Sequence, residues 1–197
     1  MEALKNKILH EGQAIGSEII KVDSFLNQQI DAQFMYEIGD EFKQRFQDKQ
    51  VDKILTIEAS GIAIAVCTSK SFAYPPVVFA KKAAAGEVSE TEDAFYSYIA
   101  KSLTKDTTSH VKLAKKFLSA GDNVLIIDDL LAYGEAALAL CDIVKQAGAH
   151  VVGIGAVIEK EFQGGGTLLR ESGYAVESLA IIEKIEDGKI TFKPDNL

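Results

Sequence analysis

The chain has 197 residues, of which 47% are hydrophobic and 25% charged, and its formal net charge is -8. This composition is ordinary for one globular domain with a full hydrophobic core, and no apolar run reaches the roughly 20 residues of a membrane span. The negative charge argues against a protein whose main task is to bind nucleic acid or an anionic membrane.

The N-terminal quarter of the chain holds two helical patterns with an irregular segment between them. Residues 2–11 place apolar side chains on one helical face. Residues 19–31 mix large apolar residues with Asn, Asp and Gln at neither the helical nor the strand period, so we expect irregular structure there. Asp31 can cap a helix over about residues 32–47, in which Phe and Ile recur every four residues.

Strands and helices then alternate along the chain. The predicted strands cover residues 53–57, 77–80, 124–127 and 151–158, and the predicted helices cover residues 62–71 and 136–147. Such an alternation implies a parallel sheet with helices on both faces. We therefore predict the α/β class.

The middle of the chain interrupts this alternation. Residues 81–93 are small, polar and acidic, which fits either a solvated linker or a mobile lid over a site. Residues 94–116 alternate apolar and polar side chains, which predicts an antiparallel insertion.

Cysteine usage and the N-terminus both bear on the cellular compartment. Cys67 and Cys141 lie in apolar helical patterns without CxxC spacing, so we expect two buried thiols rather than a disulfide. The first residues lack the apolar core of a signal peptide. We therefore expect a cytoplasmic protein.

The segment Val124–Ala136 carries the strongest functional signal. Four apolar residues lead directly into Asp128 and Asp129, and a short loop containing Gly134 follows before the next helix. Ligands of open α/β sheets bind at the carboxyl ends of such strands, and a loop at a helix N-terminus favours phosphate. Carboxylates beside a phosphate suit sugar hydroxyls or a bridging Mg²⁺.

This segment resembles the motif with which the type I phosphoribosyltransferases bind phosphoribosyl diphosphate. Residues 1–5 and three further segments are similar to the bacterial xanthine phosphoribosyltransferases of that family, and the resemblance reaches to about residue 192. The three segments are residues 21–31, 56–62 and 157–160.

The resemblance implies both a fold and a reaction. The fold is a single domain over residues 1–197, with a central, mostly parallel sheet flanked by helices. A small hood comes from about residues 12–31 and the C-terminal part, and about residues 81–93 form a flexible lid. The implied enzyme is a pentosyltransferase, a homodimer of purine salvage. It uses Mg²⁺ and transfers 5-phosphoribosyl to xanthine, giving xanthosine 5′-monophosphate and diphosphate, with no nucleic acid or membrane as partner.

The resemblance also implies how the ribose and its 5′-phosphate are bound. Asp128 and Asp129 would be the catalytic residues: they would bind the ribose hydroxyls, directly or through Mg²⁺ that the protein alone does not hold tightly, and stabilise positive charge on the ring. The phosphate loop would lack side-chain donors where many relatives have Thr or Gly, so its backbone would carry the binding. This loop consists of Ala132, Tyr133, Gly134, Glu135 and Ala136, with the Glu135 side chain expected to point to solvent.

The diphosphate would be bound by a second loop and by two lysines. Ser60 and Gly61 would offer backbone N–H groups and a hydroxyl at a helix start, although Ala59 stands where relatives often have Ser. Lys81 and Lys82, in their own or the partner subunit, would neutralise the leaving diphosphate; a solvated lysine pair is the alternative.

Four residues are the candidates for binding the purine base. Lys160 would donate to a carbonyl oxygen, although a lysine at a strand end often only reaches water. Phe162 would either stack on the ring or belong to the core. Asn27 can donate and accept at once, and Ile20 would supply a backbone or apolar contact.

Two alternatives remain open at this point. The first is a transferase for adenine, guanine or hypoxanthine, because a single contact shifts substrate preference by only about 1–3 kcal/mol. The second is a regulator that keeps this fold, senses phosphoribosyl diphosphate and binds DNA, which would need an added DNA-binding module and a basic face.

Overall fold

The structure is a computed structural model that describes residues 1–83, 92–101 and 108–194. The helices are α1 (Glu2–Glu11), α2 (Ala32–Arg45), α3 (Gly61–Ser71), α4 (Glu135–Gln146) and α5 (Gly165–Glu171). The strands are β1 (Gln13–Ile15), β2 (Ile19–Lys21), β3 (Lys53–Ile57), β4 (Val77–Ala83), β5 (Phe95–Lys101), β6 (Thr108–Ala114), β7 (Asn123–Leu131), β8 (His150–Lys160), β9 (Val176–Glu186) and β10 (Lys189–Phe192). Short π or 3-10 turns are η1 (Asp23–Asn27), η2 (Glu92–Ala94), η3 (Lys115–Phe117) and η4 (Glu161–Gln163).

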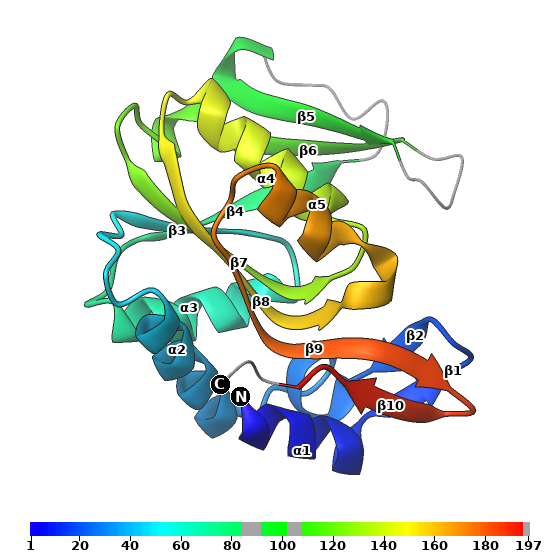
Figure 1. Cartoon of the computed structure of the whole chain (residues 1–197). Helices are drawn as coiled ribbons and strands as arrows, with labels where there is room; N and C mark the ends of the chain where they lie inside the picture. Colours follow the sequence, from blue (N-terminus) through cyan, green and yellow to red (C-terminus); the bar gives the residue numbers. More distant parts are fainter. Residues whose placement is uncertain (84–91, 102–107, 195–197) are drawn as a thin grey trace.

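One mixed, mostly parallel sheet organises the described residues, with the strand order β10-β9-β8-β7-β3-β4-β6-β5. Strands β9, β8, β7, β3 and β4 are parallel neighbours, while β10, β6 and β5 pair antiparallel. Helices α2 and α3 lie on one side of the parallel strands and α4 and α5 on the other (Figure 1). The predicted α/β class is confirmed.

Strand β7 lies at the centre of this sheet and faces two hydrophobic clusters. Leu125 and Ile127 pack into the cluster that includes α2 and α3, and Val124 and Ile126 pack into the cluster that includes α4. A strand buried on both faces needs apolar residues at every position. The unbroken apolar run of the sequence is therefore explained by burial.

Strands β4, β7 and β8 all run further than the sequence pattern predicts. Strand β7 continues to Leu131 because its residues still pair with β8, Asp128 opposite Ala156 among them. Strand β4 continues through Lys81 and Lys82 because these residues pair with β6. Ladder hydrogen bonds join backbone groups, so polar side chains do not end them.

This extension changes the boundary of the proposed lid. Residues 81–83 belong to strand β4, residues 92–94 form a short 3-10 turn, and residues 84–91 lie outside the described residues. The antiparallel insertion predicted next is confirmed, since β5 and β6 pair in register from Phe95 opposite Ala114 onward.

The segment 19–31 is more regular than expected. Ile19–Lys21 form β2, which pairs with β1 in a hairpin, and Asp23–Asn27 form one turn of π-helix. Figure 1 shows this hairpin, α1 and β10 gathered around the C-terminal half of β9. The N-terminal ammonium of Met1 donates to the Leu179 carbonyl of β9 at 2.6 Å, which ties α1 to the sheet.

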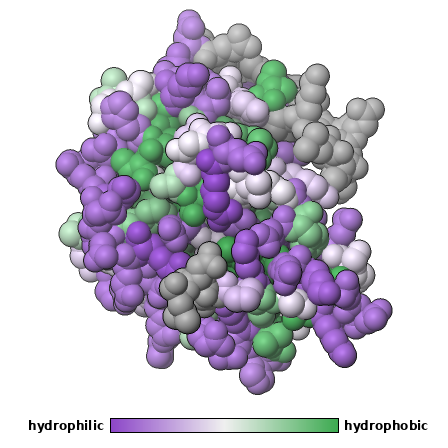
Figure 2. Space-filling model, in the orientation of Figure 1, coloured by the Kyte–Doolittle hydropathy of each residue, from purple (hydrophilic) through white to green (hydrophobic). Residues whose placement is uncertain are grey.

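Hydrophilic residues cover most of the described surface in the view of Figure 2. Cys141 is buried and Cys67 half-buried, both are free thiols as predicted, and burial raises the pKa of Cys141 to about 11. Among the described helices, none has the length and hydropathy to cross a membrane.

Candidate active site

The parallel strands β3, β7 and β8 are neighbours, so their carboxyl ends meet at one edge of the sheet. The predicted site residues Ser60, Gly61, Asp128 and Lys160 lie at or just after these ends. Gly61 and Asp128 lie close together: a Cβ added at Gly61 would lie 3.5 Å from Asp128 Oδ1. The fold thus brings together two residues that are 67 positions apart in the sequence (128 − 61).

The two adjacent aspartates have different surroundings. Asp128 is 8% exposed, while Asp129 is half-buried. Asp128 Oδ1 accepts a hydrogen bond from the Asp129 backbone N–H at 2.9 Å. Burial, followed by the charge of Asp129, raises the pKa of the Asp128 carboxyl well above its ordinary value, and the charge of Lys82 opposes this. One carboxylate is therefore enclosed, and the other is open to a ligand.

The raised pKa of Asp128 gives a pH-dependent prediction. The folded protein binds the proton of the Asp128 carboxyl more tightly than the unfolded chain does, so protonation stabilises the folded state. This stabilisation is fully present below the unfolded pKa of about 4 and is lost as pH rises toward the folded pKa. We expect Asp128→Asn to keep or raise the melting temperature at neutral pH, because the amide carries no charge to bury. Calorimetry of both proteins from about pH 4 to about pH 8 measures this, and a lower melting temperature of the variant at pH 7 would contradict it.

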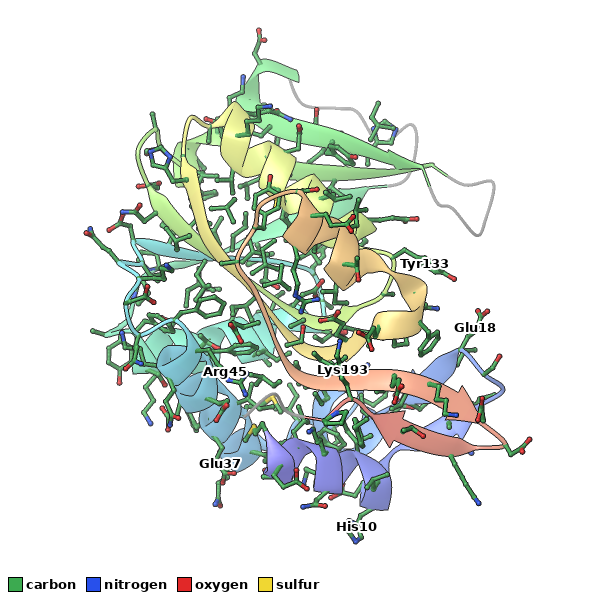
Figure 3. The ribbon with its side chains drawn as sticks, viewed as in Figure 1. His10, Glu18, Glu37, Arg45, Tyr133 and Lys193 are labelled. Atoms are coloured by element: carbon green, nitrogen blue, oxygen red, sulfur yellow. The ribbon has the colours of Figure 1, made fainter. Side chains whose placement is uncertain are left out.

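The phosphate loop, residues 132–136, opens helix α4. Gly134 adopts a left-handed conformation with φ of 85° and precedes the first helical residue, Glu135. The first N–H groups of an α-helix have no acceptor within the helix itself, so a helix start of this kind can bind an anion. Tyr133 projects away from the body of the protein (Figure 3). Glu135, whose side chain is expected to point to solvent, is half-buried and has an interaction partner.

A second loop lies at the end of β3. Ser60 precedes α3 and its hydroxyl does not cap the helix, so it is available to a ligand. Gly61 is buried against Thr56, whose Oγ1 would overlap a Cβ at this position. The Thr56 hydroxyl itself is buried without a hydrogen-bond partner among the described residues. Close packing of this kind explains why glycine begins α3.

Lys81 and Lys82 are exposed residues of strand β4. Lys82 is near enough to Asp128 for its charge to lower the pKa of that carboxyl. The charge of Lys82 therefore acts on Asp128 within the same chain.

The four residues predicted to bind a base have different surroundings. Lys160 is 7% exposed, and its Nζ donates to the Glu18 carbonyl of the β1–β2 turn at 3.0 Å. Burial lowers the pKa of this ammonium. Ile20 is a buried core residue, whereas Phe162 is 39% exposed, which removes its core alternative. Asn27 is exposed at the end of η1, and no hydrogen bond among the described residues joins it to Lys160.

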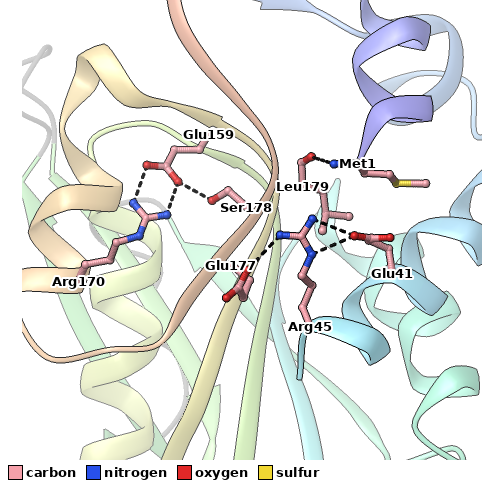
Figure 4. Close-up of polar contacts among 8 residues, drawn as sticks. All are labelled: Met1, Glu41, Arg45, Glu159, Arg170, Glu177, Ser178 and Leu179. Carbon is pink, nitrogen blue, oxygen red and sulfur yellow. Dashed lines mark hydrogen bonds and ion pairs between the residues drawn. The ribbon is translucent and has the colours of Figure 1, made fainter. Parts of the chain in front are cut away.

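Sequence reasoning missed one cluster beside this site. Glu159 of β8 is 1% exposed, and Arg170 of α5 and Ser178 of β9 donate hydrogen bonds to its carboxylate (Figure 4). Gly165 N–H donates to the carbonyl of Ala132 in the phosphate loop at 3.0 Å. The run of three glycines at 164–166 is the sequence signal that could have pointed to this close contact.

Comparison with known proteins now decides the family. The family model described as "Phosphoribosyl transferase domain" matches residues 27–191. The chain belongs to the phosphoribosyltransferase family. It is 51% identical to the xanthine phosphoribosyltransferase of Clostridioides difficile (strain 630), over 98% of this chain and 100% of that protein. It is 53% identical to xanthine phosphoribosyltransferase 1 of Clostridium perfringens (strain 13 / Type A), with the same coverage of both chains.

Solved structures support the phosphoribosyltransferase fold. The adenine phosphoribosyltransferase of Saccharomyces cerevisiae is similar with a TM-score of 0.71 at 19% identity, over 91% of this chain and 99% of that one. The adenine phosphoribosyltransferase of Thermoanaerobacter pseudethanolicus is similar with a TM-score of 0.65 at 24% identity, over 77% and 81%. At these identities the likeness is one of fold, and the predicted architecture is confirmed.

Proposed function

We propose that this chain transfers the 5-phosphoribosyl group of phosphoribosyl diphosphate to xanthine, giving xanthosine 5′-monophosphate and diphosphate. The observation that carries this proposal is its 51% identity, over 98% of its length, to a protein named xanthine phosphoribosyltransferase. The buried Lys160 at the edge that holds Asp128 and Gly61 agrees with it.

The ribose would lie over Asp128 and Asp129. Displacement at the anomeric carbon builds positive charge on the sugar ring, and carboxylates placed beforehand stabilise that charge. Positive charge on the ring would favour the ionised form of Asp128, and the enclosure of this side chain would then limit screening by water. The half-buried Asp129 is the better candidate for direct hydrogen bonds to ribose hydroxyls.

The donor's charged groups would lie on either side of this pair. The backbone N–H groups of residues 132–136 would hold the 5′-phosphate at the start of α4. Ser60, Gly61 and the ammonium groups of Lys81 and Lys82 would hold the diphosphate and neutralise its charge as it leaves.

The carboxylates also fit Mg²⁺ bound together with the donor. Asp128 and Asp129 offer the oxygen ligands that this cation prefers. Within the described ranges no three His, Cys, Asp or Glu side chains gather to hold a metal ion. We propose that Mg²⁺ takes its remaining ligands from the diphosphate and water, and that it supplies charge neutralisation there.

The base would bind at Lys160, beneath the β1–β2 hairpin. The Lys160 ammonium already donates to a carbonyl oxygen, that of Glu18, at 3.0 Å. A purine carbonyl can take that place, with Ile20, Asn27 and Phe162 forming the hood around the ring. Binding would then hold the base nitrogen in line with the anomeric carbon, which removes much of the entropic barrier.

We further propose that the enzyme works in cytoplasmic purine salvage as a homodimer. The two free thiols, Cys67 and Cys141, suit a reducing compartment. Sedimentation of the purified protein measures the oligomeric state directly.

Initial rates with four bases test the proposed substrate. With phosphoribosyl diphosphate and Mg²⁺, we expect kcat/KM for xanthine to exceed that for guanine, hypoxanthine and adenine by about tenfold or more, since each unpaired polar group costs about 1–3 kcal/mol. Reactions without the donor are the blank. A higher kcat/KM for any of the other bases would overturn the assignment of xanthine.

A further inference from the structure

Helix α5 contacts two parts of the proposed site. One is the phosphate loop, and the other is Glu159, the residue directly before Lys160. The first residue of α5, Gly165, donates its N–H to the Ala132 carbonyl, and a Cβ at this position would overlap Ala132 O and Gly134 N. No residue larger than glycine lets α5 approach the phosphate loop so closely. The position of α5 and the backbone shape of the loop are therefore linked by contact.

The other end of α5 is held by an ion pair between the exposed Arg170 and the buried Glu159. The Nη1 and Nη2 atoms of Arg170 donate to Glu159 Oε1 at 2.8 Å and Oε2 at 2.7 Å (Figure 4). This geometry is bidentate, which restricts orientation as well as distance. Gly166 completes the contact, because a Cβ there would overlap Glu159 Oε1.

Glu159 is fully engaged and charged in this arrangement. The Ser178 hydroxyl of β9 donates to its Oε2, so both carboxylate oxygens have partners. Burial would raise the pKa of Glu159, but the hydrogen bonds from Arg170 and Ser178 outweigh it and lower the pKa. The pair therefore stays ionised at neutral pH and joins β8, α5 and β9.

The place of Glu159 on β8 connects this pair with both substrates. It pairs in register with Leu131, the residue directly before the phosphate loop, and it directly precedes Lys160. A shift of Glu159 would move the strand end that carries Lys160, and a shift of α5 would move the loop.

We propose that Gly165, Gly166 and the Glu159–Arg170 pair are positioning residues, which hold the phosphate loop and Lys160 in one fixed arrangement. The inference rests on the proposed function. None of these residues needs to touch a substrate. They act by holding in place the backbone segments that do touch the substrates. A misplacement of such a segment by about 1 Å lowers the reaction rate by up to about a hundredfold.

Ribose 5-phosphate tests the donor half by titration calorimetry, without any base. We expect Gly165→Ala to raise its Kd by about tenfold or more, because the added methyl group displaces the loop. The matched control is Gly173→Ala, after the C-terminus of α5: with φ of +88° and no atom within 4 Å of the added Cβ, it strains the backbone without touching the loop. This control should lower the melting temperature and leave the Kd unchanged.

The KM values of both substrates test the link through Arg170. We expect Arg170→Met to raise KM for phosphoribosyl diphosphate and for xanthine, Arg170→Lys to restore part of the loss, and Gly165→Ala to act on the donor KM alone. Wild-type Kd values for ribose 5-phosphate in both folded Gly165→Ala and folded Arg170→Met would overturn the inference. An equal loss in Gly173→Ala and Gly165→Ala would also overturn it, and where Arg170→Met does not fold, Gly165→Ala decides alone.

A wild-type protein that binds ribose 5-phosphate and does not convert xanthine would overturn the proposed substrate. The titrations with ribose 5-phosphate would still decide the role of Gly165, so the two failures are distinguishable.

Discussion

Replacing both carboxylates in Asp128→Asn plus Asp129→Asn is expected to lower kcat by about a thousandfold or more while the protein stays folded. The amides keep the shape of the two side chains but remove the negative charge that stabilises the ribose ring in the transition state. The fold should tolerate the change, because burial makes a charge at Asp128 unfavourable. Steady-state rates with both substrates near saturation, together with circular dichroism, measure the two effects.

Asp142→Asn is the matched control for this experiment. Asp142 is half-buried on α4, like Asp129 on β7, and accepts a hydrogen bond from Gln146 away from the site. We expect wild-type kcat for this variant. Near-normal kcat in the double variant would show that the catalytic carboxylates have been assigned wrongly.

Lys160→Met is expected to lower kcat/KM for xanthine by about 10- to 200-fold, because the variant lacks one charged hydrogen bond to the base. The long apolar side chain keeps the packing of the buried lysine stem, so the loss reflects the ammonium group. The KM for phosphoribosyl diphosphate should change little, because the proposed donor contacts lie in the loop after β3, on β4, on β7 and in the phosphate loop. Initial rates over a matrix of both substrates separate the two KM values.

Lys193→Met is the control for this second experiment. Lys193 pairs at 2.5 Å with Glu161, the residue that follows Lys160 in the sequence, and its side chain is 43% exposed. This variant removes the same charge from the same region without touching the proposed base site. If it lowers kcat/KM as much as Lys160→Met does, the base contact of Lys160 is disproved.

Short-range sequence patterns predicted most of the central elements. Strand β3 covers the predicted residues 53–57, and α1 covers the predicted residues 2–11. Both patterns succeed for a local reason, since apolar spacing reports which side of an element is buried. The same reasoning predicted that strand β7 ends at Ile127, although it continues to Leu131. The polar residues that follow Ile127 end the apolar pattern, but they do not end the backbone hydrogen bonds to β8.

The contacts around Glu159 could not be predicted in this way. A carboxylate in a strand is ordinarily expected at the surface, and only Arg170 and Ser178, supplied by other elements, make its burial favourable. Hydrogen bonding across more than ten positions leaves no periodic trace in the sequence. For the same reason, the contact of Lys160 with Glu18 is a property of the folded hood.

The sequence by itself determined the class of fold, the family resemblance and the acidic pair before the phosphate loop, because these depend on residue type and short spacing. The tertiary structure alone decided that Asp128 is enclosed while Asp129 is half-buried, and that α5 connects the phosphate loop with the strand end at Lys160. Burial and contact depend on which distant segments meet. That meeting is a result of packing the whole chain, and no single segment encodes it.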